Sequence, residues 1–225
     1  MKGFTLSEVL IILGIIGVVA TLTLPSLIAN YQKKQTAIRL KKTYSELTQV
    51  IMLSEIDNGS LENWNYSLSA AAFLDTYLAK YLKNLKAVST TTIDNKLHYK
   101  FLDGTRAYNT TTLTGHSLLS INGVHVSIGS FMFNDAKDIM IDINGEKGPN
   151  TYGKDFFLFV ISAKHGLIPN GSAIISGMYA NPEHLTRNEL INGNRIRACR
   201  KDGYGYWCAA LIMQDGWEIK DDYPW

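Results

Sequence analysis

The chain has 225 residues with 22 basic and 20 acidic side chains, so its formal net charge at neutral pH is only +2. A balance so close to zero argues against nucleic acid as a partner held by bulk charge, although it leaves a local site open. Hydrophobic residues make up 46% and aromatic residues 11%, which is an ordinary composition for a globular chain. The length is ample for one domain with a full core.

The N-terminal part holds a long uncharged segment. From Val9 to Leu24 every residue is Val, Leu, Ile, Gly, Ala or Thr, and charge returns only at Lys33 and Lys34. A bilayer core needs about 20 apolar helical residues, so this segment is long enough to span one. A carboxylate, Glu8, stands at its start. A charged side chain costs roughly 2.5–3.5 kcal/mol near a bilayer centre and less near the interface. An acid at that place indicates a function.

The stretch Gly3-Phe4-Thr5-Leu6-Ser7-Glu8, directly before the apolar segment, resembles the cleavage signal of type IV pilins and type II secretion pseudopilins. The resemblance implies that a prepilin peptidase cuts between Gly3 and Phe4 and N-methylates Phe4. It also implies that Glu8 pairs with the amino group of Phe4 on a neighbouring subunit, a charge pair that would fix register in a low-dielectric bundle. Pro25 stands where pilins often carry a helix-kinking proline.

The resemblance divides the chain into four parts: a leader peptide (1–3), a transmembrane and filament-core helix (4–29), the amphipathic half of the same helix (30–58) and a globular head (59–225). The implied function is that of a structural subunit of a type IV pilus or a type II secretion filament. Its partners would be other pilin-like subunits, prepilin peptidase and the inner membrane. The head would lie in the periplasm before assembly and in a periplasmic or extracellular filament afterwards.

Two other interpretations of the N-terminus stay open, a cleaved secretory signal and a plain signal anchor. The nearest candidate signal-peptidase site, Leu27-Ile28-Ala29, has the wrong first residue. The alternative function is a signal-anchored extracytoplasmic ligand-binding domain that does not polymerise, in which Glu8 is dispensable and Gly3-Phe4 is never cut. We expect no enzyme, because the five histidines show no metal-ligand spacing and no nucleophile or phosphate-loop motif occurs.

The apolar segment is expected to continue into an amphipathic helix. Leu40, Tyr44, Leu47 and Ile51 are spaced by four, three and four residues, and Asn58-Gly59 gives a stop signal. A helix from about residue 4 to residue 57 would be roughly 80 Å long.

A second helix is predicted at 69–86, capped by Ser67 or Ser69. Its apolar residues recur at helical spacing and are expected to pack on the core rather than to form a partner surface. They are Phe73, Leu74, Tyr77, Leu78, Tyr81, Leu82 and Leu85.

The region after residue 97 has short runs of strand character. The alternation of Val124, Val126 and Ile128 with polar residues predicts a half-buried antiparallel sheet. The predicted strands are 97–102, 124–128, 131–133, 139–143 and 156–161, with hairpin-like turns at Asp103-Gly104 and Asn122-Gly123. The order of a long helix, a second helix and then strands predicts an α+β fold. The resemblance implies a pilin-like one, with the long N-terminal helix packed on an antiparallel sheet and a C-terminal disulfide loop.

The loop from Asp142 to Asp155 is the most chemically suggestive one. Asp142, Asn144 and Asp155 offer oxygen ligands of the kind that calcium prefers, and some pseudopilins bind calcium in a loop of this region. The full EF-hand pattern is absent. The alternative, which we favour, is a turn held by Asp and Asn side chains bonded to the backbone.

The two cysteines, Cys199 and Cys208, lie nine positions apart without C-x-x-C spacing or nearby histidines. Behind an export signal they are predicted to form a disulfide, with two buried free thiols as the alternative. The tail around them resembles the disulfide-bounded region of pilin-like proteins. Its aromatic residues are expected to pack inward, although with nearby basic residues they could also form a nucleic-acid or glycan surface. These aromatics are Tyr204, Tyr206 and Trp207, and the basic residues are Arg195, Arg197, Arg200 and Lys201.

Overall fold

The computed structural model describes residues 5–82, 86–87, 99–107, 117–121, 123–129, 135–145, 147–172, 185–194 and 196–225. Several predicted features lie outside these residues. They are Gly3, Phe4, Leu85 of the predicted second helix, residues 97–98 of the predicted strand at 97–102, the strand at 131–133, Asn122 of one predicted turn, and Arg195.

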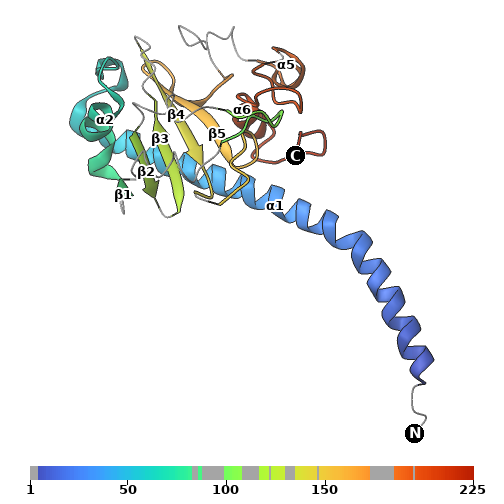
Figure 1. The fold of residues 1–225 in the computed structure, drawn as a ribbon. Coiled ribbons are helices and arrows are strands. Elements are labelled where there is room, and N and C mark those ends of the chain that lie inside the picture. The colour runs from blue at the N-terminus through green and yellow to red at the C-terminus, as the bar shows by residue number, and fades with distance from the viewer. Residues whose placement is uncertain are drawn as a thin grey trace.

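A single helix, α1 (Leu6–Asn58), forms the axis of the molecule and is 53 residues long. It ends at Gly59, whose φ of 78° is easily adopted by glycine, so the predicted stop at Asn58-Gly59 is confirmed. Its N-terminal half projects from the head, and α1 changes direction along its length (Figure 1). Pro25 lies inside the helix, where proline removes a backbone hydrogen bond and favours bending.

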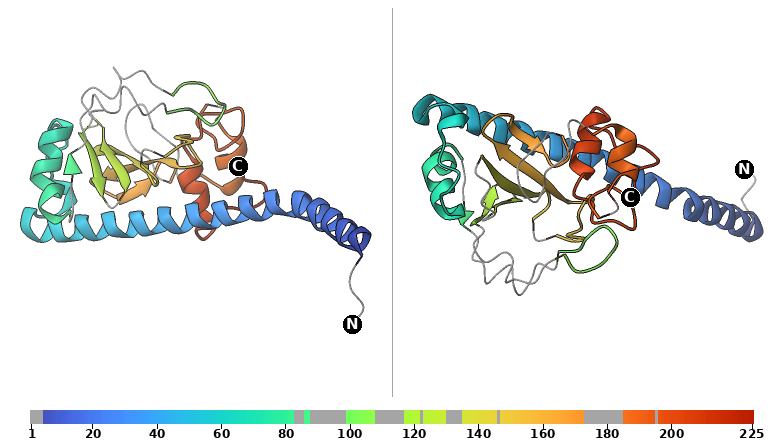
Figure 2. Two further views of the ribbon diagram at one scale, coloured as in Figure 1. Left: turned by 60° about the horizontal axis from the view of Figure 1, so that its bottom comes forward. Right: turned by 90° about the horizontal axis from the view of Figure 1, so that it is seen from above.

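The second half of α1 packs on the head. Its first buried residue is Thr36, and Leu40, Leu47 and Ile51 of the predicted stripe are all buried. The side chain of Tyr44 is partly buried and its hydroxyl donates to the Leu167 carbonyl at 3.2 Å. The amphipathic half predicted from spacing therefore anchors the helix to the sheet, as Figure 2 shows from two further directions.

The sheet is a six-stranded antiparallel meander in the order β1-β2-β3-β4-β5-β6. The strands are β1 (Lys86–Ala87), β2 (Ser117–Ile121), β3 (Val124–Ile128), β4 (Ala136–Asp142), β5 (Phe156–Ser162) and β6 (Gly166–Pro169). The predicted strands at 124–128, 139–143 and 156–161 correspond to β3, β4 and β5. Short strands β1, β2 and β6 were not predicted.

The prediction of a half-buried sheet is wrong for β3, β4 and β5, because every residue of β4 and β5 and every residue of β3 after Val124 is buried, His125 and Ser127 included. The α1 side chain Tyr44 lies over one face, with its ring centroid 5.9 Å from that of Phe159. On the other face Tyr99 and Tyr152 pack on Phe156 at centroid distances of 4.3 and 4.6 Å. Side chains on both faces of β5 are therefore covered. The alternation of apolar and polar residues along the chain does not reveal this burial.

The predicted strand at 97–102 is also wrong within the described residues. Lys100 forms only isolated bridges, to Arg106 and to Thr151. The Asp103-Gly104 turn is confirmed, since Phe101 N donates to the Thr105 carbonyl at 2.8 Å and Gly104 has a φ of 84°. This segment is a small hairpin outside the main sheet.

The second helical region is shorter and less regular than predicted. It consists of α2 (Ala70–Phe73), a π-helical turn η2 (Leu74–Leu78) and a 3₁₀ turn η3 (Ala79–Tyr81), preceded by a 3₁₀ turn η1 (Leu61–Asn63). Ser69 is the cap, and its hydroxyl accepts from Ala72 N at 3.2 Å. The predicted packing is confirmed, because Phe73, Tyr77 and Leu78 are buried.

The C-terminal region contains α5 (Arg187–Asn192) and α6 (Cys208–Gln214). Helix α6 begins at the second cysteine of the tail. Helix α5 was not predicted, although Thr186 and Glu189 form a capping box, a pattern readable in the sequence.

Candidate functional site

The start of α1 holds the predicted assembly residue, Glu8. Its Oε2 accepts hydrogen bonds from the Thr5 backbone N at 2.8 Å and from the Thr5 hydroxyl at 2.9 Å. The Thr5 hydroxyl in turn accepts from Glu8 N at 3.3 Å, which completes a capping box. The carboxylate therefore already has an intramolecular role in closing the helix N-terminus. Sequence reasoning missed this role, although Thr-x-x-Glu is its signature.

The first half of α1 is an exposed and largely apolar helix. From Leu6 to Gln35 the helix has no buried residue, and large side chains such as Leu10, Leu22 and Leu27 are 61%, 75% and 65% exposed. Among the described residues this is the one helix long and apolar enough to cross a membrane, judged by length and composition. An apolar surface of this extent needs lipid or protein to cover it.

The predicted calcium residues do come together in the β4–β5 loop. Asp142 Oδ1 accepts from Asn144 N at 3.1 Å and Gly145 N at 2.9 Å, and its Oδ2 accepts from the Tyr99 hydroxyl at 3.1 Å. Burial is the main cause that raises the pKa of Asp142, to about 8, and the hydrogen bonds oppose that rise.

Asp155 is held in the same way from the other end of the loop. Its Oδ1 accepts from Thr151 N at 2.6 Å, and its Oδ2 accepts from Asn150 N at 2.8 Å and from Asn144 Nδ2 at 3.1 Å. Burial again raises its pKa. All four carboxylate oxygens of Asp142 and Asp155 thus serve backbone or side-chain donors.

In this geometry, hydrogen bonds from backbone and side-chain donors to Asp142 and Asp155 hold the loop. In the described parts of the chain, no group of three or more His, Cys, Asp or Glu side chains is arranged to hold a metal ion. Calcium requires six to eight oxygens, and the buried amide oxygens of Asn144 and Asn150 are the acceptors here without a partner among the described residues. The loop is explained without a cation, and calcium binding stays a prediction.

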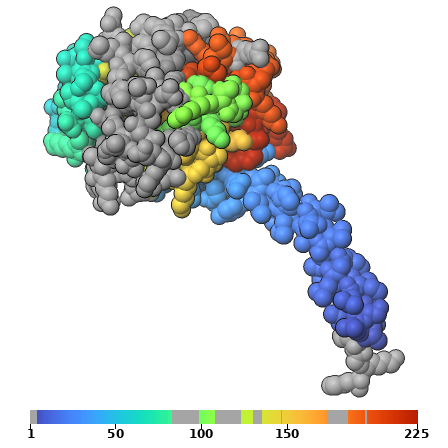
Figure 3. All heavy atoms as spheres, viewed as in Figure 1, coloured from blue at the N-terminus to red at the C-terminus, as the bar shows by residue number. Residues whose placement is uncertain are grey.

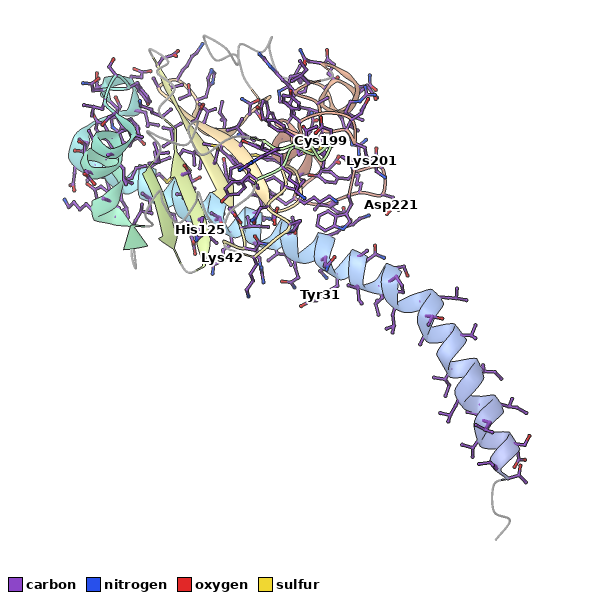
Figure 4. All side chains as sticks on the ribbon, viewed as in Figure 1. Tyr31, Lys42, His125, Cys199, Lys201 and Asp221 are labelled. Atoms are coloured by element: carbon purple, nitrogen blue, oxygen red, sulfur yellow. A yellow bond between two sulfur atoms is a disulfide. The ribbon has the colours of Figure 1, made fainter. Side chains whose placement is uncertain are left out.

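The predicted disulfide between Cys199 and Cys208 is present, with a Cα–Cα distance of 4.7 Å and both residues fully buried (Figure 4). A closed loop of this length stabilises by roughly 2–3 kcal/mol on the chain-entropy model. The disulfide packs against Gly153 of the β4–β5 loop, and the Tyr223 hydroxyl donates to the Gly153 carbonyl. Two regions that the sequence suggested separately therefore form one structural unit.

The tail aromatics pack inward, as the favoured interpretation predicted. Tyr206 and Trp207 are buried, and Tyr204 stacks on Phe101 with ring centroids 3.8 Å apart. Tyr206 and Trp207 are therefore not available to an open aromatic surface for nucleic acid or glycans, whereas Tyr204 is only partly buried. Tyr206 also meets Tyr152 edge-on at 5.3 Å.

An ion-pair network that the sequence did not indicate holds the last residues. The Arg187 guanidinium donates to both oxygens of Asp215, at 2.7 and 3.0 Å, and to both oxygens of Asp222, at 2.7 Å each. Bidentate pairs of this kind fix geometry as well as charge. They tie helix α5 to the C-terminal tail.

Residues 26–225 match the model of one protein family. The chain belongs to DUF6613, a family of unknown function. No curated protein and no solved structure matches the chain. The DUF6613 match begins directly after Pro25, so it covers the packed half of α1, the sheet, the β4–β5 loop and the disulfide tail.

Proposed function

We propose that this DUF6613 protein is a structural subunit of a filament of the type IV pilin class, either a pilus or a type II secretion filament. The observation that carries the proposal is the division of α1. One half packs on the head, and the other is an apolar helix with no buried residue between Leu6 and Gln35. Such a helix is covered by lipid before assembly and by the same helix of other subunits afterwards.

Two further features support the proposal. The signal-like stretch from Gly3 to Glu8 stands directly before this apolar helix, where a peptidase at the membrane surface would meet it. The helix, antiparallel sheet and C-terminal disulfide agree with the fold that the resemblance implies.

Two observations point to opposite sides of the membrane for the head. Lys33 and Lys34 come directly after the apolar segment, and the positive-inside rule would place them in the cytoplasm. The buried disulfide instead requires an oxidising compartment. We give the disulfide more weight, because a cytosolic head would keep both thiols reduced, and we place the head in the periplasm.

The Thr5–Glu8 capping box indicates which hydrogen bonds of Glu8 would change during assembly. In the isolated subunit the Glu8 carboxylate is satisfied by the Thr5 N–H and hydroxyl, which lowers the penalty of placing it near lipid. To pair with the amino group of Phe4 on a neighbour, Glu8 has to share or exchange these bonds. Assembly would then replace a local neutral donor with a charged one.

The experiment compares Glu8→Gln with Glu8→Ala in cells that have their own filament machinery. Gln keeps the capping box but has no charge, whereas Ala loses both. We expect both variants to be cut normally after Gly3, and both to fall at least tenfold in the filament fraction recovered by shearing. Thr5→Ser, which keeps the hydroxyl cap, is the matched control and should assemble normally. Normal assembly of Glu8→Gln would mean that capping alone explains Glu8.

The second candidate is the signal-anchored extracytoplasmic domain that does not polymerise. The capping box favours this candidate, because it supplies hydrogen-bond donors to the Glu8 carboxylate within one chain, without a second subunit. This candidate predicts that neither Glu8 variant changes location and that the chain keeps its leader.

A further inference from the structure

A pocket of about 400 Å³ lies at the neck of the molecule, where α1 leaves the head. One side is formed by α1 residues such as Tyr31, Gln35 and Arg39, and the other by Lys154 of the β4–β5 loop and by Trp225. In Figure 3 the yellow atoms of that loop and the red atoms of the C-terminal tail border α1 at this place. The pocket therefore joins the membrane-proximal side of the head to the helix.

The position along α1 sets the depth of the pocket relative to a membrane. The proposed membrane-spanning part of α1 ends at residue 29, and Tyr31 to Gln35 rise about 3–9 Å above that point at 1.5 Å per residue. The headgroup layer on each side of a bilayer is roughly 5–8 Å thick. The lower wall of the pocket therefore lies at headgroup level if residues 4–29 span the membrane.

Two basic side chains, Arg39 and Lys154, line the pocket against one carboxylate, Asp155. The side chains of Arg39 and Lys154 form no ion pair with any residue that the structure describes. The Thr36 hydroxyl, one turn before Arg39, donates to the Lys154 carbonyl at 3.4 Å, and both basic residues line the same pocket. The lining carboxylate, Asp155, already accepts three N–H bonds within the loop.

The surroundings extend this charge and add aromatic rings. An adjoining pocket of about 340 Å³ shares Arg39 and adds Lys42 and Lys147, of which Lys42 pairs with Glu46 at 3.7 Å. Tyr31 is 64% exposed, and Figure 4 labels it on the helix just outside the head. Tyrosine and tryptophan beside basic residues are typical of the membrane interface.

We propose that this neck pocket binds the headgroup of an anionic membrane phospholipid, with Arg39 and Lys154 as the phosphate-contacting side chains. Bound lipid would hold the head at a fixed height and orientation on the membrane while the subunit waits for assembly. The inference rests on the proposed membrane position of residues 4–29, but it needs neither cleavage nor a second subunit.

The test uses the full chain in detergent, titrated with short-chain phosphatidylglycerol or phosphatidylcholine and followed by native mass spectrometry. We expect phosphatidylglycerol to bind at least tenfold more tightly than phosphatidylcholine. The double variant Arg39→Gln/Lys154→Gln should lose on the order of tenfold in phosphatidylglycerol affinity, since each basic residue near an anionic surface contributes several-fold. The charge-preserving exchange Arg39→Lys/Lys154→Arg should retain it.

The matched control is Lys164→Gln/Lys201→Gln, which removes the same charge from two exposed positions that do not line the pocket. Figure 4 labels Lys201 in the C-terminal region. Equal loss in the control variant, or equal affinity for both lipids, would overturn the proposal. If glycerol phosphate binds as tightly as the lipid, the pocket is a general anion site and the proposal is overturned as well.

Thermal unfolding of each variant shows whether it folds. If the double variant does not, Arg39→Gln alone repeats the test, because that side chain is exposed and its loss leaves the core intact. If the lipid does not bind, the filament proposal is unaffected. If the leader is not cut, the pocket still belongs to a membrane-anchored domain and can still bind lipid. The two failures are therefore distinguishable.

Discussion

Gly153 lies directly against the disulfide: a β-carbon at this position would stand 2.7 Å from the Cys208 sulfur. The glycine also has a φ of 78°. Its carbonyl accepts the Tyr223 hydroxyl, so one residue links the β4–β5 loop to the disulfide and to the C-terminal tail. The loop that borders the neck pocket therefore depends on the tail for its shape.

Gly153→Ala should destabilise the protein by about 2–4 kcal/mol, because it combines left-handed backbone strain with a clash against a buried sulfur. Gly104→Ala is the matched control, since Gly104 has a φ of 84° but nothing within 4 Å of its β-position. The control should lose about 1 kcal/mol. Denaturant unfolding of the full chain in detergent measures both, and equal losses would show that the contact with Cys208 is unimportant.

Calcium should not change the thermal stability of the protein if hydrogen bonds to its own side chains hold the β4–β5 loop. Millimolar calcium is expected to leave the thermal midpoint within experimental error, because the Asp142 and Asp155 oxygens already accept hydrogen bonds. Magnesium serves as the control for ionic strength. A rise in the midpoint with calcium that Asp142→Asn abolishes would restore the calcium interpretation.

Stability should fall as pH rises from about 4 to 7 because of Asp138. This carboxyl is 1% exposed, its Oδ1 has no hydrogen-bond partner among the described residues, and burial raises its pKa from 3.8 to about 7. The folded chain then binds more protons than the unfolded chain across that interval. The stabilisation is fully present below pH 4 and is lost as pH rises through 7.

Asp138→Asn removes this titration while keeping the side-chain shape. At pH 8 the variant should be more stable than the natural chain by up to about 4 kcal/mol, and the two should converge near pH 4. Thermal midpoints measured at both pH values test this. An equal difference at pH 4 and pH 8 would mean that the effect is not a titration.

Much of the fold could be predicted from local pattern. The helix from Leu6 to Asn58, its stop at Gly59 and the packing of Leu40, Leu47 and Ile51 follow from composition and periodicity, which do not depend on the rest of the chain. The disulfide followed from an export signal rather than from geometry. The Thr5–Glu8 capping box is readable in the sequence as Thr-x-x-Glu at the start of an apolar run.

The remainder depends on tertiary contacts. One face of β5 is covered by Tyr44 of α1, and the other by Tyr99 and by Tyr152 of the preceding loop. No periodicity along the strand gives these contacts. The contact of Gly153 with Cys208 joins residues 55 positions apart. The neck pocket is likewise formed where the loop meets α1, and only the folded chain brings Arg39 and Lys154 together.

The most direct test of the filament proposal is the mass of the N-terminal peptide of the mature protein, taken from membranes of cells with their own processing machinery. We predict a peptide that begins at Phe4 and carries one methyl group on its amino nitrogen. A peptide that retains Met1, or one that begins after Ala29, would contradict the proposal and leave the anchored or secreted binding domain in its place.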